Sequence, residues 1–210
     1  MPTYLVRVWL PDRPGALGQV ASRIGAVRGD VVGIEILERG AGRAIDELVV
    51  ELPDDGLVDL LVSEISQVDG VDVEDVRTLH SDRHDPGLTV LATATRLMEA
   101  GDEAMMLKVL CEHLVADFES DWAVALRLAT ADTLVEVGEA PSPAWVAAFV
   151  HGSRHLDGGA NGESGPDDVA WADLGGAGVA LALGRKGRPF RWRERRQLAA
   201  LARIAELRLG

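Results

Sequence analysis

The order of apolar patterns in the first 79 residues is the feature that most constrains the fold. Residues 3–10 are rich in β-forming side chains and partly alternate, and they end at the turn-forming segment Pro11-Asp12-Arg13-Pro14-Gly15. From Ala16 to Val27 the apolar residues recur at steps of three and four, which predicts a helix with one buried face that Gly29 closes. The chain therefore begins with a strand, a tight turn and a helix.

The following residues predict a hairpin, a second helix and a last strand. Residues 31–38 and 44–52 are β-rich and are joined by Arg39-Gly40-Ala41-Gly42, whose glycines suit a reversing turn. Apolar spacing over 57–68 predicts the second helix, and 71–79 alternates as a strand. This split βαβ order predicts an α+β, ferredoxin-like βαββαβ domain, with a four-stranded antiparallel sheet and both helices on one face.

Apolar side chains point to both faces of the first strand. Tyr4, Val6, Val8 and Leu10 face one way, and Leu5 and Trp9 face the other. Because the two helices cover only one face, we expect self-association, at least as a dimer, to cover the second.

A second domain follows a polar segment without periodicity. We place the first domain at 1–80, a linker at 81–87 and the second domain at 88–210. The second domain is predicted to be mixed, with a central antiparallel sheet. The predicted helices are 88–98, 103–118, 142–150 and 193–209, the predicted strands are 122–128, 133–137, 169–174 and 178–183, and the glycine-rich residues 157–166 are predicted to form a mobile loop.

Composition narrows the classes of partner. The formal charge is −13, from 34 acidic and 21 basic residues, which disfavours binding to nucleic acid or to an anionic membrane. A lone cysteine, Cys111, forms no internal disulfide, and the chain shows neither a leader nor a run of about 18 apolar residues. We therefore expect a cytoplasmic protein.

One segment departs from this acidic character. Residues 185–196 hold seven basic side chains against the single acidic Glu194. Aromatic residues for stacking on bases are limited here to Phe190 and Trp192. A solvated helix start is one interpretation, and an electrostatic contact between domains or subunits is favoured over nucleic-acid binding.

The first strand–helix junction is the best candidate binding site. The backbone N–H groups of Gly15, Ala16 and Leu17 converge there with the positive end of the helix dipole, so a carboxylate would bind. Pro14 fixes its φ near the helix start, and Gly15 has no Cβ to obstruct a ligand.

An amino acid bound in this way also needs a partner for its ammonium group. Asp12 beside the turn, or Asp30 at the start of the second strand, would supply one, and we expect both to lie near one end of the sheet. The alternative is structural: Asp12 caps the helix or stabilises the turn, and Asp30 is a solvated turn residue.

The segment from Asp12 to Val20, after a strand and within a βαββαβ order, resembles an ACT domain over roughly residues 3–79. The resemblance implies a regulatory module that binds amino acids or other small effectors at the interface between paired domains. The candidate ligand-binding residues are Asp12, Arg13, Pro14, Gly15, Ala16, Leu17, Asp30 and Val31.

Residues 88–209 resemble a small GAF-like domain in their order of elements, with Arg188-Pro189-Phe190 leading into the last helix. The resemblance implies a sensory or dimerising module. Since no ligand site is visible in this part of the sequence, we expect a domain that kept the fold and lost its ligand.

Enzymatic and metal-dependent classes have little support. His80 with His84 and His151 with His155 have a spacing that suits zinc on a helix, but neither pair has the glutamate of a His-Glu-x-x-His motif, so solvated histidines are favoured. Cys111 fits a buried helical face. We expect no enzyme, cofactor or metal; the leading hypothesis is a non-enzymatic regulatory protein, and the alternative is a ligand-free scaffold that dimerises through both domains.

Overall fold

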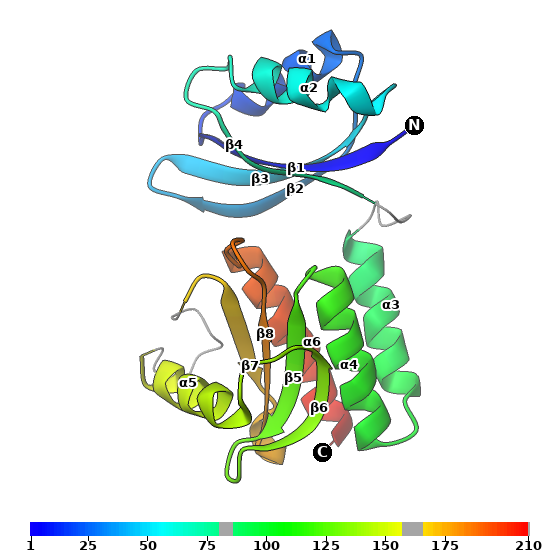
Figure 1. Cartoon of the computed structure of the whole chain (residues 1–210), viewed down its shortest axis with the longest axis vertical. Coiled ribbons are helices and arrows are strands. Elements are labelled where there is room, and N and C mark those ends of the chain that lie inside the picture. The colour runs from blue at the N-terminus through cyan, green and yellow to red at the C-terminus, as the bar shows by residue number, and fades with distance from the viewer. Residues whose placement is uncertain (80–85, 157–165, 210) are drawn as a thin grey trace. The chain divides into compact units, whose positions relative to one another are not determined.

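The computed structural model describes residues 1–79, 86–156 and 166–209, which form two compact units, Met1–Pro86 and Gly87–Gly210 (Figure 1). Most of the predicted linker and of the predicted mobile loop lies outside the described residues. Each unit has its own sheet and its own hydrophobic core, so each is described by itself.

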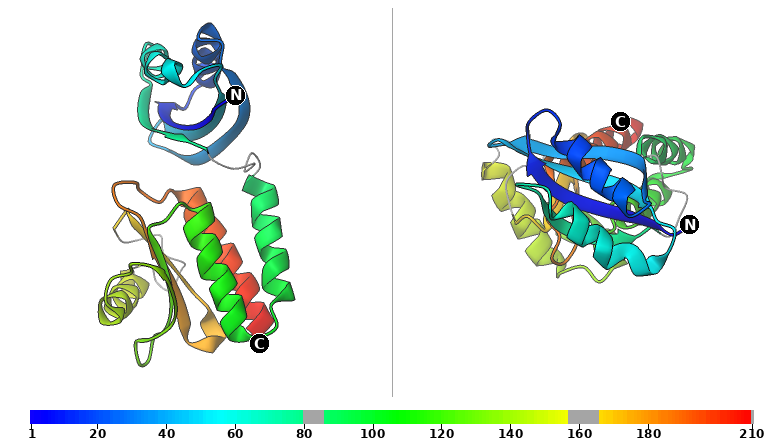
Figure 2. Two further views of the ribbon diagram at one scale, coloured as in Figure 1. Left: turned by 45° about the vertical axis from the view of Figure 1, so that its right-hand side comes forward. Right: turned by 90° about the horizontal axis from the view of Figure 1, so that it is seen from above.

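The first unit has the predicted βαββαβ order, and its fold class is confirmed. One antiparallel sheet has the strand order β2-β3-β1-β4. Two helices pack on one face of this sheet (Figure 2). The elements are β1 (Thr3–Pro11), α1 (Ala16–Ala26), β2 (Asp30–Gly40), β3 (Arg43–Glu51), a short 3-10 turn η1 (Asp55–Leu57), α2 (Val58–Ile65) and β4 (Asp72–Thr78).

Alternation along the strands builds the core of this unit. Val6 and Val8 on β1 are fully buried, as are Val20 and Ile24 on α1 and Leu61 on α2. These side chains lie between the sheet and the helices in one continuous cluster. The three- and four-residue spacing read from the sequence therefore marks the packed faces of both helices.

Helix α1 ends at Ala26, shortly before Gly29. Arg28 takes the left-handed conformation after the helix, with φ 61°. Gly29 donates its N–H to the carbonyl of Ile24. A Cβ at Gly29 would lie 2.9 Å from Ile24 Cγ2 and 3.1 Å from Leu52 Cδ2, so the glycine is required for close packing.

The hairpin turn is shorter than predicted. Gly40 pairs with Arg43, so only Ala41 and Gly42 connect β2 to β3. Both have positive φ, 50° and 77°, as a two-residue reversing turn requires.

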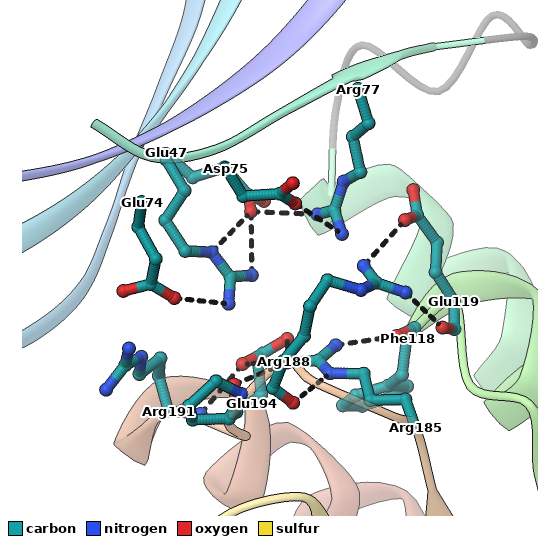
Figure 3. Close-up of polar contacts among 12 residues, drawn as sticks. Glu47, Glu74, Asp75, Arg77, Phe118, Glu119, Arg185, Arg188, Arg191 and Glu194 are labelled. Atoms are coloured by element: carbon teal, nitrogen blue, oxygen red, sulfur yellow. Dashed lines mark hydrogen bonds and ion pairs between the residues drawn. The ribbon is translucent and has the colours of Figure 1, made fainter.

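Polar side chains occupy part of the sheet face that the helices leave open. Arg7 on β1 binds the carboxylate of Glu47 on β3 at 2.7 Å, and Arg77 on β4 binds the same carboxylate at 3.0 Å. Trp9 donates its indole N–H to Glu74. Figure 3 shows Glu47, Glu74 and Arg77 of this cluster. The expectation of an apolar second face, drawn from Leu5 and Trp9, is therefore incomplete, because ion pairs lie between those apolar side chains.

The second unit is a mixed domain around a second antiparallel sheet, with the strand order β6-β5-β8-β7. Helices α3, α4 and α6 lie on one face of the sheet and α5 lies on the other (Figures 1 and 2). The elements are α3 (Pro86–Glu99), α4 (Glu103–Asp117), β5 (Trp122–Arg127), β6 (Asp132–Gly138), α5 (Pro143–Leu156), β7 (Val169–Asp173), a 3-10 turn η2 (Gly175–Ala177), β8 (Val179–Gly184) and α6 (Trp192–Leu209).

Part of the basic segment 185–196 is structural. Arg185, only 1% exposed in its side chain, donates to the carbonyl of Phe118 at 2.7 Å and to that of Pro189 at 2.8 Å. It also pairs with Glu194 at 2.7 Å, as Figure 3 shows. Arg195 is buried as well. The interpretation of residues 185–196 as a fully solvated helix start is therefore wrong, because Arg185 is buried and binds main-chain carbonyls and Glu194.

Candidate functional site

The junction of β1 and α1 has the backbone geometry of an open cradle. Gly15 precedes the helix with φ 88° and ψ −12°, in the left-handed region that favours glycine. A Cβ built on it would meet nothing within 4 Å. Asp12, Arg13 and Pro14 are exposed, whereas Ala16 is buried at 1% exposure. The core thus fixes the helix start while the loop before it faces open space.

The donors at the helix start are only partly used. Ala16 donates its N–H to the carbonyl of Arg13 at 3.3 Å, and Gln19 donates to that of Gly15 at 3.0 Å. Among the described residues, the N–H groups of Gly15, Leu17 and Gly18 have no acceptor, and no side chain caps the helix. Of the three donors that the sequence predicted to be vacant, Gly15 and Leu17 are vacant and Ala16 is engaged; Gly18 is a further vacant donor that the sequence reasoning missed.

The structural alternative for Asp12 was that its side chain caps the helix or stabilises the turn. The side chain of Asp12 does not cap α1, since no side chain caps this helix. Its main-chain N–H donates to the carbonyl of Gly42 at 2.9 Å, and the next N–H, that of Arg13, donates to Pro11 at 2.8 Å. The main chain, and not the Asp12 carboxylate, ties the loop to the hairpin turn.

Asp30 does not lie near this loop, contrary to the expectation. Asp30 pairs with Glu51 on β3, and Glu51 pairs with Thr3 on β1. Asp12 follows Pro11, at the other end of β1. At about 3.3 Å per residue, the nine residues of β1 put roughly 25 Å between the two ends. Within one copy of the chain, Asp12 and Asp30 therefore cannot hold the same small molecule.

The remaining predicted residue, Val31, is half-buried and packs against the core beneath α1. Its register places it beside Asp30, at the far end of the sheet from Gly15. The structure thus brings together Asp12 to Leu17 and separates the 30–31 pair from them.

Asp46, on β3, is a residue of this region that sequence reasoning missed. It lies on the helix-facing side of the sheet, in register with Val8 on β1 and Ile36 on β2, and its own-strand neighbours on that side are Ala44 and Leu48. It is 3% exposed, and its Oδ1 has no hydrogen-bond partner among the described residues. A buried carboxylate oxygen without a donor is costly and is uncommon in folded proteins.

The charged groups around Asp46 have opposing effects on its carboxyl. Burial raises the pKa of that carboxyl above the ordinary value of 3.8, the positive charge of Arg39 lowers it, and the negative charge of Asp12 raises it. The signal in the sequence was an acidic residue at a strand position whose alternate neighbours, Ala44 and Leu48, are apolar.

Other chemistry-bearing residues do not join this site. Cys111 is fully buried in the core of the second unit, as predicted, and burial raises the pKa of its thiol to about 12. His80 and His84 lie outside the described residues, and His151 is exposed. Across 1–79, 86–156 and 166–209, no group of three or more His, Cys, Asp or Glu side chains is placed to share a metal ion.

The second unit has a surface cavity of its own, of about 290 Å³. Trp122 and Trp145 line it, together with Asp121, Asp168 and Lys186. Gly184 makes room for the Trp122 indole, because a Cβ there would lie 2.4 Å from the ring. None of the predicted ligand-binding residues lines this cavity.

In the part of the chain that the structure describes, no helix is both long and apolar enough to cross a lipid bilayer.

Comparison with known proteins gives a small set of similar structures. No family model matches the sequence, and no curated protein matches it. The ACT domain from the GTP pyrophosphokinase of Chlorobium tepidum is similar over 38% of this chain and 100% of that one, at 18% identity and a TM-score of 0.31. The C-terminal domain of the MgtC protein from Mycobacterium tuberculosis is similar over 40% and 93%, at 17% identity and a TM-score of 0.31. A formyltetrahydrofolate deformylase from Pseudomonas putida is similar over 47% and 38%, at 16% identity and a TM-score of 0.30. None of these three is a GAF domain, and the GAF-like resemblance of the second unit stays a prediction.

Proposed function

We propose that this chain is a non-enzymatic regulatory protein whose first unit, an ACT-like domain, binds an amino acid or a similar small effector at the start of α1. The observation that carries the proposal is the vacant helix start. Among the described residues, the amide donors of Gly15, Leu17 and Gly18 have no acceptor, and Gly15, which has no Cβ, leaves the approach open. Convergent N–H groups at the positive end of a helix dipole bind carboxylates.

In this proposal the effector site is completed by pairing of two copies. The edge strand β2 presents apolar side chains, since Val32, Ile34 and Ile36 are 40%, 52% and 37% exposed. Edge strands with exposed apolar residues favour pairing with another chain. The second unit, as a GAF-like module, would contribute dimerisation or a contact to another protein.

The competing function is a ligand-free scaffold that dimerises through both units. The same exposed row on β2 supports it, because self-association alone would cover that row. It differs from the regulatory function in one measurable respect: a scaffold forms dimers whose stability does not respond to amino acids.

Isothermal titration calorimetry and thermal-shift measurements on the full chain, with the common amino acids as ligands, test the proposal. Leu17→Pro removes one vacant donor at a position in the first helical turn that tolerates proline, so it should weaken binding. Gly15→Ala should also weaken it, by straining a residue at φ 88°. Gly187→Ala is the matched control, because Gly187 has φ 75° and open space around it but lies in the second unit.

The expected result is a saturable response to at least one amino acid that Leu17→Pro and Gly15→Ala reduce and Gly187→Ala does not. If the wild-type chain forms a dimer and responds to none of the amino acids, the regulatory function is wrong and the scaffold function stands.

A further inference from the structure

We propose that the surface cavity of the second unit binds a small quaternary ammonium compound that also carries an oxygen acceptor. The cavity, of about 290 Å³, lies where β5 and β7 begin and β8 ends, beside the start of α5. The binding groups are the indoles of Trp122 and Trp145 and the carboxylate of Asp168. This inference concerns the second unit alone and is independent of the effector site proposed for the first.

Two tryptophans line the cavity, and a neighbouring residue positions each of them. Trp122 lies against Gly184, its register partner on β8, where a Cβ would come within 2.4 Å of the ring. Trp145, on the first turn of α5, stacks on Phe149 with ring centroids 5.5 Å apart and ring planes 6° from parallel. Phe149 covers one face of the Trp145 indole, and Trp145 is still 44% exposed. The cavity therefore offers aromatic surface that is already in place for a ligand.

Two carboxylates give the cavity negative charge. Asp121 and Asp168 come directly before β5 and β7, the two strands that flank β8. Two strand spacings put their main chains roughly 10 Å apart. Main-chain bonds hold both residues, because Asp121 donates to Gly184 at 2.8 Å and Asp168 accepts from Arg185 at 3.0 Å. In the part of the chain that the structure describes, the Asp168 carboxylate has no hydrogen-bond or ion-pair partner.

The basic residues of the lining do not neutralise these two carboxylates. The guanidinium of Arg185 is 1% exposed and binds the carbonyl of Phe118 and the carboxylate of Glu194, so its charge is already balanced. Lys186 donates its main-chain N–H to the Asp121 carboxylate at 2.8 Å, but its ammonium forms no ion pair with any described residue. The cavity thus has two carboxylates against one ammonium group, and an excess of negative charge favours a cation.

One buried donor at the cavity lacks an acceptor. A buried indole N–H usually has a hydrogen-bond partner. Trp122 is only 9% exposed, and within residues 1–79, 86–156 and 166–209 nothing accepts from its Nε1. This nitrogen lies 2.7 Å from the position of a Cβ on Gly184, which also lines the cavity. A ligand oxygen would satisfy the donor, and Lys186 would pair with that oxygen if it were charged.

A quaternary ammonium group matches these features better than a metal ion or a bare ammonium. A hard metal ion needs several oxygen ligands, and no group of three or more acidic, histidine or cysteine side chains is placed to supply them in the described ranges. A bare ammonium is strongly hydrated and needs acceptors for its N–H groups. A quaternary ammonium has no N–H and is attracted by the faces of tryptophan rings. Choline, with a hydroxyl, and glycine betaine, with a carboxylate, both combine this cation with an oxygen.

Heteronuclear NMR on the full, isotope-labelled chain tests the inference. The five tryptophans give one indole N–H signal each, and substitution of Trp122 and Trp145 assigns the two that matter. Choline and glycine betaine, titrated separately, should shift these two signals saturably and leave the others in place. Choline should bind roughly 5- to 30-fold more tightly than its uncharged isostere, in which a tert-butyl group replaces the trimethylammonium. It should bind roughly 2- to 10-fold more tightly than tetramethylammonium, which has no oxygen.

Two substitutions locate the site. Trp145→Leu keeps an apolar side chain and removes the indole, and Asp168→Asn removes the charge, so each should weaken choline binding by about 5-fold or more. Trp192→Leu and Asp167→Asn are the matched controls, because both residues are exposed in the same unit and neither lines the cavity. Circular dichroism establishes that each variant is folded.

Three results would overturn the inference. The first is that neither choline nor glycine betaine shifts the signals of Trp122 and Trp145. The second is that choline binds no more tightly than its uncharged isostere, or binds Asp168→Asn as tightly as the wild type, because the cavity then does not recognise the positive charge. The third is that sodium acetate shifts the Trp122 signal and choline does not, because Lys186 and the indole N–H then form an anion site. None of these results affects the effector site proposed for the first unit.

Discussion

Asp46→Asn should make the first unit more stable at neutral pH, although it replaces a buried polar side chain. In the unfolded chain the Asp46 carboxylate is hydrated, whereas in the fold it is 3% exposed and its Oδ1 has no hydrogen-bond partner in the described residues. Leaving a buried polar group unpaired costs about 1 to 3 kcal/mol, and more when the group is charged. Asparagine keeps the shape and removes the charge.

We therefore expect the variant to gain about 1 kcal/mol or more in free energy of unfolding at pH 7. For a unit the size of Met1–Pro86, each kcal/mol raises the melting temperature by about 4 to 8 °C. The gain should depend on pH, because the pKa of Asp46 in the folded state lies above its ordinary value of 3.8. The folded protein then binds the proton more tightly than the unfolded chain, so wild-type stability falls as pH rises from 3.8 through the folded-state pKa and is level above it.

Urea unfolding of the full chain, followed by circular dichroism at a series of pH values, measures this difference. The gain of Asp46→Asn over the wild type should be complete at neutral pH and should vanish below the unfolded-state pKa of 3.8, where aspartate is protonated in both states. Asp30→Asn, a change at an exposed position, should shift stability by no more than about 0.5 kcal/mol. A variant less stable than the wild type at pH 7, or a gain equal at acid and neutral pH, would refute the reasoning, because Asp46 would then be satisfied within the fold.

Three further predictions concern other buried groups. Tyr4, the only tyrosine, donates its hydroxyl to Asp55 at 2.6 Å; this bond and burial raise its pKa to about 12. Its contribution to stability should be complete below pH 10 and lost as pH rises through about 12, so tyrosinate absorbance should show the raised midpoint and Tyr4→Phe should remove the alkaline decline. The thiol of Cys111, with a pKa of about 12 and no exposed surface, should react with iodoacetamide only after unfolding; rapid alkylation of the native chain would contradict its burial. Glu194→Gln leaves the charge of Arg185 buried without its partner and should cost about 3 to 5 kcal/mol, measured by urea unfolding; a change below about 1 kcal/mol would show that the main-chain carbonyls suffice.

The fold of the first unit could be predicted from the sequence because the period of the apolar residues changes clearly between two and three-to-four. The strand at 3–10 and the helix from Ala16 are found within a residue of their predicted bounds. Local packing was less predictable. Gly29 was expected only to close α1; in the structure Arg28 has the left-handed backbone there, and Gly29 makes room for Ile24 and Leu52. Such contacts join residues that are distant in the chain and leave no local pattern.

The candidate site shows a different kind of error. The expectation that Asp12 and Asp30 lie together neglected the direction of the chain: α1 runs back across the sheet, so β2 and β1 start at the same end of the sheet, with β3 between them. The predicted strand–helix–strand order already implies that the second strand starts at the end of the sheet where the first strand starts. Asp46 was also readable, since an aspartate at a position whose alternate neighbours are apolar breaks the strand pattern. The inward role of Arg185 was not readable, because its partners include main-chain carbonyls whose orientation depends on the tertiary fold.

The vacant amides at the start of α1 separate the two candidate functions. A unit with only a structural role would be more stable with a capping side chain before the helix. Gly15 precedes α1 instead and no side chain caps it, so the N–H groups of Gly15, Leu17 and Gly18 have no acceptor among the described residues. An effector whose carboxylate binds these donors should stabilise the first unit in proportion to its occupancy, whereas the stability of a ligand-free scaffold should stay the same whatever amino acid is added.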